Sequence, residues 1–574
     1  MDDGISQECI WKLDARDEAA EQELAEAADI PVILASLLRA RGVHTPEAVK
    51  TFLQPSLEAL YDPMELPDMR PAAERVIEAL ADGEPVLIHG DFDADGITAT
   101  ALLVQFLSRL GGEAHYYVPH RVEDGYGLIP YAVEEAVKRD INLIITVDCG
   151  VTNVEEISRG REMGAEFIII DHHLPGPELP DALVVDPKRT DYDGPDDDLA
   201  AVGLAYKFAE AICRMMEIPL ESVRRAFFDL VAIGTVADVV PLVGENRIFV
   251  KYGLQLLPHT RKPGLTALMN LTDINGEVSA QDISYRLAPR LNACGRMADA
   301  SDAIDLILAG DEDVAMKAAL DMEGLNNRRQ REQETTLTSA QSMIAQRIDF
   351  EQDAVIVLES EDWHAGIIGI VASRLVEEHY RPVFLMTRQD DVYRGSARSI
   401  EGFHVANALQ ECSDLLQRHG GHALAGGFTV PVDRLPAFRE RLNDIARRTL
   451  LPQDLKPTIR IDAEIPLGEV DENLVQQLRR MEPFGHSNPE PVFMSPQVEI
   501  VEVRQVGREG KHLKLLAACG DRVFDCIGFN MGDEAEWIRP GRPVDLAYTP
   551  EFNEFNGRVS LQLRLADLRP ADTT

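Results

Sequence analysis

Acidic and histidine side chains follow three short apolar runs in the first half of the chain. The runs are Val86–Ile88, Leu143–Val147 and Phe167–Ile170. Such runs are typical of buried parallel strands, and open α/β sheets place their sites in the loops at the carboxyl ends of these strands. The side chains that follow the runs are His89, Asp91, Asp93, Asp95, Asp148, Asp171, His172 and His173. We therefore expect up to five carboxylates and three imidazoles in one crevice.

This many carboxylates can lie close together only if they take up protons or bind cations. Oxygen ligands with one or two imidazoles suit Mg²⁺ or Mn²⁺ and are too hard a set for structural zinc. The set is larger than one ion needs. We therefore expect two ions that share a bridging carboxylate, an arrangement that drives the attack of water on phosphate esters. The alternative is that each aspartate only ends a strand or caps a helix, but this explanation would have to hold for all three clusters at once.

The motifs resemble those of the DHH phosphoesterase superfamily. The first three are Asp91–Gly96, Asp148 and Asp171–His173, and a fourth follows at Gly234–Leu242. Within this superfamily the chain is similar to the RecJ family, bacterial 5′→3′ exonucleases specific for single-stranded DNA, from about residue 45 to the C-terminus. The resemblance implies a metal-dependent exodeoxyribonuclease that releases 5′-mononucleotides and acts in DNA repair and recombination.

The spacing of the motifs suggests a role for each side chain. Asp148 is the single acid on its strand, so it is our candidate for the bridging ligand. His172 would bind the second ion together with Asp95 and Asp238. The predicted catalytic and metal-binding residues are Asp91, Asp93, Asp95, Asp148, His172, His173 and Asp238, with His89 as a further candidate ligand.

Two histidines in this set are open to more than one interpretation. The first ion would be completed by His89 or by Asp91. The family usually relies on the position of Asp91, whereas related DHH phosphatases have a ligand histidine at the position of His89, so both alternatives remain. His173 is expected to orient or protonate a group rather than to bind metal.

The overall charge argues against a nucleic-acid substrate. The formal net charge is −42 and the pI is about 4.7, whereas nucleic-acid binders usually carry a basic surface. The hydrophobic content of 45% and the charged content of 27% are ordinary for a soluble globular protein. Metal would neutralise several carboxylates, and binding depends on the charge of a local cleft rather than on the total. The acidity is also compatible with a saline habitat.

The remaining composition favours a cytoplasmic location. The seven cysteines are scattered and form no Cys-x-x-Cys pair, so the sequence predicts neither a disulfide framework nor a zinc knuckle. The N-terminus carries Asp2, Asp3 and Glu8 where a signal peptide would be basic, and it has no apolar segment of the required kind. No stretch reaches the roughly 18–20 apolar residues of a membrane span, so we expect no membrane association.

The elements that must position these residues form an α/β protein with five segments. We expect residues 1–30 to be a solvated or partly disordered acidic lead-in, and residues 32–60 to form short helices that pack on the next domain. Alternating strands and helices over 71–240 predict a mainly parallel sheet with helices on both faces. The predicted segments are 1–70 (lead-in and N-terminal helices), 71–270 (DHH catalytic domain), 271–349 (arginine motif and connecting helix), 350–450 (DHH-associated α/β domain) and 457–570 (OB-type β-barrel).

Outside the acidic clusters, the predicted substrate-binding residues are Arg121, Arg296, Ser396, Arg398 and His422. The loop of Arg121 could be an ordinary connection, and the arginines around Arg296 could form an interdomain salt-bridge cluster; the resemblance instead favours contacts with phosphate and with the DNA backbone. Ser396 and Arg398 are candidates for a pocket for the terminal 5′-phosphate. His422 follows a Gly-Gly pair that resembles the signature of the DHH-associated domain, and it is a candidate for substrate binding or proton donation.

The C-terminal barrel would bind the strand by stacking bases on aromatic side chains. The candidates are Phe529, Tyr548, Phe552 and Phe555, although any one of them could belong to the core. The expected partners are single-stranded DNA with a 5′ end and, as candidates, a single-strand-binding protein or a helicase; we expect a monomer. One alternative is a DHH phosphodiesterase acting on short oligonucleotides, cyclic dinucleotides or pyrophosphate, which would not need the barrel. Another is a catalytically inactive DHH scaffold, which would not need the intact ligands.

Overall fold

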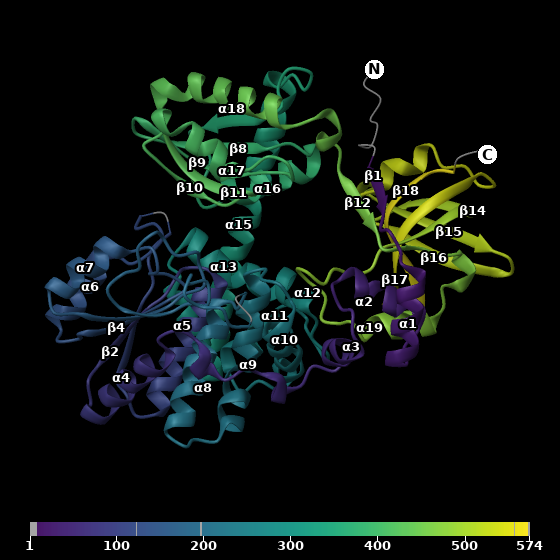
Figure 1. The fold of residues 1–574 in the computed structure, drawn as a ribbon. Coiled ribbons are helices and arrows are strands. Elements are labelled where there is room, and N and C mark those ends of the chain that lie inside the picture. The colour runs from purple at the N-terminus through teal and green to yellow at the C-terminus, as the bar shows by residue number, and fades with distance from the viewer. Residues whose placement is uncertain (1–8, 122, 196–197, 556, 572–574) are drawn as a thin grey trace. The chain divides into compact units, whose positions relative to one another are not determined.

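The computed structural model describes residues 9–121, 123–195, 198–555 and 557–571, and it divides into two compact units (Figure 1). One unit is Ser56–Leu451. The other combines Met1–Pro55 with Pro452–Thr574, so the two ends of the chain belong to the same unit. Among the described residues, no helix is both long and apolar enough to cross a membrane.

The larger unit begins with the predicted parallel sheet. Its five strands have the order β3-β2-β4-β5-β6, and all neighbours are parallel. In this register Val147 pairs with Ile170, and Ile170 pairs with Val185, so the carboxyl ends of the strands lie side by side. The bounds are β2 Val86–His89, β3 Ala114–Tyr117, β4 Leu143–Val147, β5 Glu166–Ile170 and β6 Leu183–Val185.

Alternate residues of these buried strands enter two hydrophobic clusters, one on each face of the sheet. Ile88 and Ile145 belong to one cluster, which includes residues of α5, α8 and α9. Leu87 and Ile144 belong to the other, which includes residues of α6 and α7. The predicted parallel sheet with helices on both faces is therefore confirmed. The helices are α4 Met69–Asp82, α5 Ala94–Arg109, α6 Pro130–Lys138, α7 Val154–Glu162, α8 Ala201–Met215, α9 Leu220–Ala237, α10 Gly244–Leu256 and α11 Pro263–Leu271.

The arginine motif is helical and leads to the predicted long connecting helix. A π-helical turn at Ile283–Leu287 precedes α13 (Ala288–Met297), which is followed by α14 (Ser301–Leu308) and α15 (Glu312–Arg347). The second sheet has the order β10-β11-β9-β8-β7, with only β7 and β8 parallel. Its elements are β7 Ile356–Ser360, α16 Ile368–His379, β8 Val383–Gln389, β9 Val392–Arg398, α17 Val405–Glu411, β10 Arg418–Gly421, β11 Ala425–Pro431 and α18 Leu435–Thr449.

The smaller unit contains the predicted barrel. Five strands pair in the order β14-β15-β16-β18-β17, and a pairing of β14 with β17 closes the ring. The strands are β14 Phe493–Val506, β15 His512–Cys519, β16 Arg522–Gly528, β17 Pro543–Phe555 and β18 Arg558–Pro570. The run at 459–461 lies in β12 (Thr458–Ile461), which pairs with the N-terminal strand β1 (Ile10–Leu13) instead of joining the barrel.

Two expectations for the N-terminal residues are wrong. Residues 10–13 form β1, and α1 (Glu18–Ala28) buries Leu24 and Ala25, so this part of the lead-in is folded although it is acidic. Residues 1–8 lie outside the described residues. Helices α2 (Val32–Ala40) and α3 (Pro46–Leu53) belong to the unit of the barrel, not to that of the next domain along the chain, and Leu37 and Phe52 share one hydrophobic cluster with barrel residues.

Candidate active site

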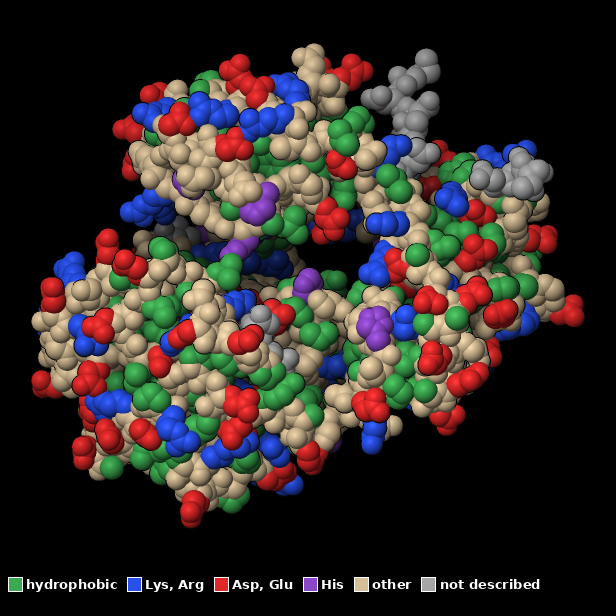
Figure 2. Space-filling model, in the orientation of Figure 1, with side chains coloured by type: hydrophobic (Ala, Val, Ile, Leu, Met, Phe, Trp, Pro, Cys, Tyr) green, Lys and Arg blue, Asp and Glu red, His purple; other side chains and the backbone are tan. Residues whose placement is uncertain are grey.

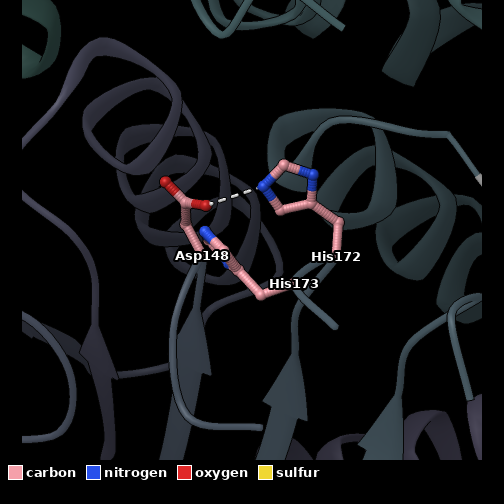
Figure 3. A group of neighbouring side chains, drawn as sticks. All are labelled: Asp148, His172 and His173. Carbon is pink, nitrogen blue, oxygen red and sulfur yellow. Dashed lines mark ion pairs between the residues drawn. The ribbon is translucent and has the colours of Figure 1, made fainter. Parts of the chain in front are cut away.

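Carboxylates and histidines meet at the carboxyl ends of the parallel strands in the larger unit. The side chains of Asp148 and His172 face each other there, with His173 beside them (Figure 3). The site contains three groups of candidate metal ligands, and within each group the ligand atoms lie within 4.8 Å of one another. The groups are Asp91, Asp93 and Asp148; Asp95, His172 and Asp238; and Asp148, His172 and His173. Asp148 belongs to two of the three, which is the position that a bridging ligand requires. We call Asp91, Asp93, Asp95, Asp148 and Asp238 the carboxylate cluster.

Backbone amides hold the first two ligand carboxylates. Asp93 caps α5, with Oδ1 accepting hydrogen bonds from the backbone N–H groups of Asp95 and Gly96 at 3.0 and 3.2 Å. The carboxylate of Asp95 accepts the N–H groups of Ala201 and Val202 at the start of α8, at 2.8 and 2.9 Å. Both carboxylates are therefore fixed at helix N-termini, where partial positive charge favours an anion.

Asp148 is placed by an unusual backbone conformation, and Asp238 by the end of a helix. Asp148 has a φ of +64°, in the left-handed region that few side chains adopt, and its N–H donates to the carbonyl of Ile170 on the neighbouring strand at 3.0 Å. Asp238 is the C-cap of α9. A Cβ atom at Gly234, in the last turn of α9, would lie 2.8 Å from Oδ1 of Asp95, so a glycine is needed for this close approach.

His172 has the geometry of a metal ligand. The ring is buried, and neither nitrogen makes a hydrogen bond within the described residues. Nε2 lies 3.2 Å from Oδ1 of Asp148 and 3.7 Å from Oδ2 of Asp238. Burial and then the charge of His173 lower the pKa of His172 to about 3, so the ring is neutral, as metal binding requires.

Burial and mutual repulsion raise the pKa of the clustered carboxyl groups. Burial and then the charge of Asp93 raise the pKa of Asp95 to about 7. Burial and then Asp95 raise the pKa of Asp238 to about 9. The pKa values of Asp91 and Asp148 are also raised, by burial first and by Asp93 second. Deprotonation of all these groups therefore requires cations, and the donor set of carboxylates and one neutral imidazole fits Mn²⁺ or Mg²⁺.

His89 lies outside the three ligand groups, whereas His173 belongs to one of them and is also bonded to Asp171. His89 is in none of the three groups; its Nε2 accepts the N–H of Ile129 at 3.2 Å, and Nδ1 lies 3.7 Å from Sγ of Cys149. Nδ1 of His173 lies 2.7 Å from Oδ1 of Asp171. Burial alone would lower the pKa of His173, but the hydrogen bond and the charge of Asp171 outweigh burial and raise it, so His173 is suited to carry a proton.

Four arginines form a second like-charged cluster in the same unit. On the face drawn in Figure 2, acidic side chains are spread over the surface among Lys and Arg. In contrast, no ion pair with a carboxylate is found for Arg121, Arg296, Arg329 or Arg398 in the part of the chain that the structure describes; we call them the arginine cluster. Burial and then the charges of Arg121, Arg398 and Arg329 lower the pKa of Arg296 to about 9, while Asp93 opposes this shift. Arg296 and Arg121 therefore lie within electrostatic range of the carboxylates Asp93 and Asp91. None of the four arginines has a carboxylate ion-pair partner among the described residues.

Three family models match the chain: DHH family, N-terminal domain, over residues 85–235; DHHA1 domain over 352–448; and RecJ OB domain over 461–567. The single-stranded-DNA-specific exonuclease RecJ of Bacillus subtilis (strain 168) is 36% identical over 562 residues, which cover 97% of this chain and 70% of that protein. RecJ of Escherichia coli (strain K12) is 33% identical over 577 residues, covering 96% and 98%. The chain belongs to the RecJ family.

Solved RecJ structures have the same architecture. The crystal structure of RecJ from Thermus thermophilus in complex with Mn²⁺ matches with a TM-score of 0.85 and 32% identity, covering 98% of this chain and 80% of that chain. The complex of the same protein with Mg²⁺ gives a TM-score of 0.79 and 30% identity, covering 98% and 79%. The α/β architecture with a DHH domain, a DHHA1 domain and an OB barrel is therefore confirmed for this RecJ family member.

The predicted substrate-binding residues of the DHHA1 domain lie at different places. Ser396 Oγ accepts a hydrogen bond from Arg398 Nη1 at 3.0 Å. A Cβ atom on Gly369, in the first turn of α16, would lie 3.0 Å from Ser396 Oγ and 3.2 Å from Arg398 Nη2, so the helix N-terminus, the hydroxyl and the guanidinium adjoin one another. His422 is exposed on the β10–β11 hairpin, and no contact places it in either cluster among the described residues.

Some functional candidates of this RecJ chain were missed in the sequence. Arg329, on the connecting helix α15, is half-buried, and its guanidinium donates to Asn326 and Gln333 at 3.0 and 3.1 Å. Asn292 Oδ1 accepts the N–H of Ala94 at 2.9 Å and so joins α13 to the first acidic loop. Only tertiary contacts reveal these two roles, because neither residue breaks the helical pattern around it.

The aromatic candidates of the RecJ OB domain also divide. Tyr548 is fully buried and its hydroxyl lies 2.8 Å from Oγ of Ser495, so it belongs to the core and our stacking prediction for it is wrong. Phe529 is 55% exposed, which leaves much of its ring accessible to a base. The ring of Phe552 lies 5.0 Å from the guanidinium carbon of Arg479. The side chain of Phe555 lies outside the described residues.

Proposed function

We propose that this chain is a metal-dependent exonuclease that degrades single-stranded DNA from its 5′ end and releases 5′-mononucleotides. The observation that carries the proposal is the pairing of two incomplete clusters. The carboxylate cluster needs divalent cations, and the arginine cluster beside it needs an anion. Two Mn²⁺ or Mg²⁺ ions would neutralise the carboxylates, and the phosphates of a DNA strand would neutralise the arginines.

The ligand groups provide for two ions. Asp91, Asp93 and Asp148 would hold one, and Asp95, His172 and Asp238 would hold the other, with Asp148 between them. When bound, such a pair of ions activates a water molecule and offsets negative charge on the phosphoryl oxygens. The protonated ring of His173, aligned by Asp171, is positioned to orient or protonate an oxygen of the substrate.

The DHHA1 domain would hold the strand end. Backbone N–H groups at the start of α16, Ser396 Oγ and the guanidinium of Arg398 are suited to a terminal phosphate, because helix N-termini and arginine both favour dianions. Burial and then the charge of Arg121 lower the pKa of Arg398, which indicates that Arg121 is near enough to add a second cation. A phosphate in this pocket would place the first internucleotide linkage at the metal ions.

Digestion of a strand labelled at either end tests the proposal. With Mn²⁺, a 5′-label should be released first as a mononucleotide, whereas release of a 3′-label first would give the opposite polarity. Arg398→Ala should lower the preference for a 5′-phosphate over a 5′-hydroxyl by about tenfold, since it removes one charge-assisted hydrogen bond. Arg418→Ala on β10, which β11 separates from β9 in the sheet, should leave the preference unchanged. An unchanged preference in Arg398→Ala would remove Arg398 from the pocket.

Two further experiments separate the alternatives. A phosphodiesterase for short substrates would cleave a dinucleotide faster than a long strand. An inactive scaffold would show no tight Mn²⁺ binding by calorimetry. The OB barrel, with Phe529 exposed, favours a long strand. We further propose that the enzyme acts as a monomer in the cytoplasm, in DNA repair and recombination, with a single-strand-binding protein or a helicase as its partner.

A further inference from the structure

A fourth strand end reaches the site, beyond the three that the sequence motifs mark. Strand β6 ends at Val185 and is followed by the turn Asp186–Arg189. Oδ1 of the buried Asp186 accepts the N–H of Lys188 at 2.7 Å, and the N–H of Arg189 donates to the carbonyl of Asp186 at 3.4 Å. Proline at the second position and aspartate at the first are typical of such turns. The turn is therefore firmly held.

The sheet register places this turn beside the metal-ligating histidines. Val185 pairs with Ile170, and the carbonyl of Val185 accepts the N–H of Asp171 at 3.2 Å. Residues that follow Val185 thus run beside those that follow Ile170, which include His172. Parallel strands keep this neighbourhood at their carboxyl ends.

The two cations of the turn differ in their partners. Arg189 donates to Asp68 at 2.6 Å and to the carbonyl of Val184 at 2.9 Å, and it forms two further hydrogen bonds with Asp191. Lys188 makes no ion pair with any carboxylate among the described residues. In a chain with 98 acidic and 56 basic residues, a lysine beside a carboxylate-rich site would be expected to have a partner.

The charge of Lys188 acts on the second ligand group. Burial and then His173 account for most of the lowered pKa of His172, and Lys188 contributes in the same direction. Burial, Asp95 and Asp93 raise the pKa of Asp238, and Lys188 opposes them. The ammonium group therefore lies within electrostatic range of both ligands.

We propose that Lys188 binds a non-bridging oxygen of the scissile phosphate on the side of His172 and Asp238. An ammonium group is a compact cation with three donors, which suits a phosphoryl oxygen. A lysine next to a bound divalent cation is repelled by it, and a phosphate between the two removes this repulsion. The inference rests on the proposed function, and it adds a substrate contact to those proposed for the arginine cluster.

Sulfur substitution at the first internucleotide linkage tests the contact. Single-turnover cleavage would be measured with Mn²⁺ on 5′-phosphorylated strands that carry oxygen, or sulfur in either the Rp or the Sp configuration, at that phosphate. Lys188→Ala should slow cleavage of the oxygen substrate about 100-fold. The wild-type enzyme should be slowed by sulfur at the oxygen that Lys188 contacts, and in Lys188→Ala this penalty should fall to near onefold for that isomer alone. Lys188→Arg should recover part of the rate.

Two further measurements make the result decisive. Lys188→Ala should bind Mn²⁺ at least as tightly as the wild type in calorimetry, because a repulsive charge is lost. Lys138→Ala, which removes an exposed lysine paired with Glu135 at 2.7 Å on α6, should match the wild type throughout. An undiminished sulfur penalty in Lys188→Ala, or weaker Mn²⁺ binding, would overturn the proposal. Failure of the proposed function itself would be visible separately, as a wild-type enzyme that releases no nucleotide from either end.

Discussion

The carboxylate cluster and the arginine cluster each bring like charges together, but the charges have opposite sign and are held by different kinds of structure. Within the described residues the carboxylates form no ion pair with Lys or Arg, and the arginines form none with Asp or Glu. The carboxylates are held by short connections: strand ends, helix N-termini and one left-handed residue. The arginines come from four separate segments: the loop before α6, α13, α15 and β9. The comparison teaches that the metal half of the site is built rigidly before the substrate arrives, whereas the anion-binding half depends on the packing of several segments.

The comparison also explains how so acidic a chain can bind DNA. A net charge of −42 was counter-evidence in the sequence, but the total does not describe the site. Four guanidinium groups without carboxylate partners among the described residues, next to carboxylates that metal would neutralise, form a local attractive field. The rest of the surface is free to be acidic.

Loss of the bridging carboxylate should have the largest effect. Asp148→Asn keeps the size of the side chain but removes the charge that two of the three ligand groups share. We expect cleavage to fall by about 10³-fold or more, and the Mn²⁺ stoichiometry in calorimetry to fall below two. Circular dichroism should show an intact fold. Asp305→Asn, outside the ligand groups and bonded to the Tyr116 hydroxyl, is the matched control. Two undiminished Mn²⁺ sites in Asp148→Asn would break the assignment of this half of the comparison.

A smaller effect is expected in the arginine cluster. Within the described residues Arg296 has a single hydrogen bond, to the carbonyl of Gly366 at 3.1 Å, so its charge is available to a phosphate. In the cleavage-deficient Asp148→Asn background, Arg296→Ala should weaken single-stranded DNA binding about 10- to 100-fold. The slope of log K against log salt should fall by about 0.7.

Arg290→Ala is the matched control on the same helix, because Arg290 is already paired with Glu323 at 2.5 Å. It should lower the melting temperature without changing the salt slope. Fluorescence anisotropy over a salt series distinguishes the two variants. If both lost affinity equally, the distinction between paired and unpaired arginines would have no functional meaning.

The metal half of the site has a stronger local signal in the sequence than the anion half, for which Arg121, Arg296 and Arg398 were proposed but Arg329 was not. Motifs such as Asp93-x-Asp95 and Asp171-His172-His173 are local, and a parallel sheet brings strand ends together whatever the details of packing, so the ligand set could be proposed from the sequence. Arg329 and Lys188 have no local signature. Their proposed roles depend on two properties of the folded chain: which charged groups lie near them, and whether they form an ion pair with a carboxylate.

The prediction for the N-terminal residues was wrong for a related reason. Composition made residues 1–30 look solvated, but β1 adds to β12, about 450 residues later in the chain. Leu24 and Ala25 of α1 then have a hydrophobic cluster to enter. Neither the pairing nor the cluster can be seen in a window of neighbouring residues.

The crowding of the carboxylates should have a moderate effect on the pH dependence of the free energy of unfolding. A carboxyl group whose pKa is higher in the folded chain holds more protons when folded, so its contribution is present below the unfolded pKa and is lost as pH rises through the folded pKa. For Asp95 and Asp238 the pKa rises from 3.8 to about 7 and about 9. With metal removed by a chelator, the free energy of unfolding should therefore contain a component that declines between about pH 4 and 9.

Mn²⁺ should oppose this decline in the free energy of unfolding at high pH, because it binds the deprotonated carboxylates. At a free concentration one hundred times the Kd, each site should add about 2.7 kcal/mol to the free energy of unfolding. The gain in melting temperature on adding a fixed Mn²⁺ concentration should be larger at about pH 8.5 than at about pH 6. Asp148→Asn should show a reduced gain. A gain that is equal at both pH values would show that proton release does not accompany metal binding.

The smallest effect on metal binding is expected at His89, which sharpens the boundary of the carboxylate cluster. Its Nε2 accepts the N–H of Ile129, and Nδ1 faces the Cys149 thiol, so both nitrogens are engaged by the protein. His89→Leu should keep two Mn²⁺ sites with Kd values within about twofold of the wild type, and it should lower the free energy of unfolding by about 1–3 kcal/mol because the Ile129 amide loses its acceptor. Asp91→Asn, at the other candidate position, should lose one site. Loss of a Mn²⁺ site in His89→Leu with retention in Asp91→Asn would exchange the two residues. The first ion would then have a softer ligand set, which would favour Mn²⁺ over Mg²⁺.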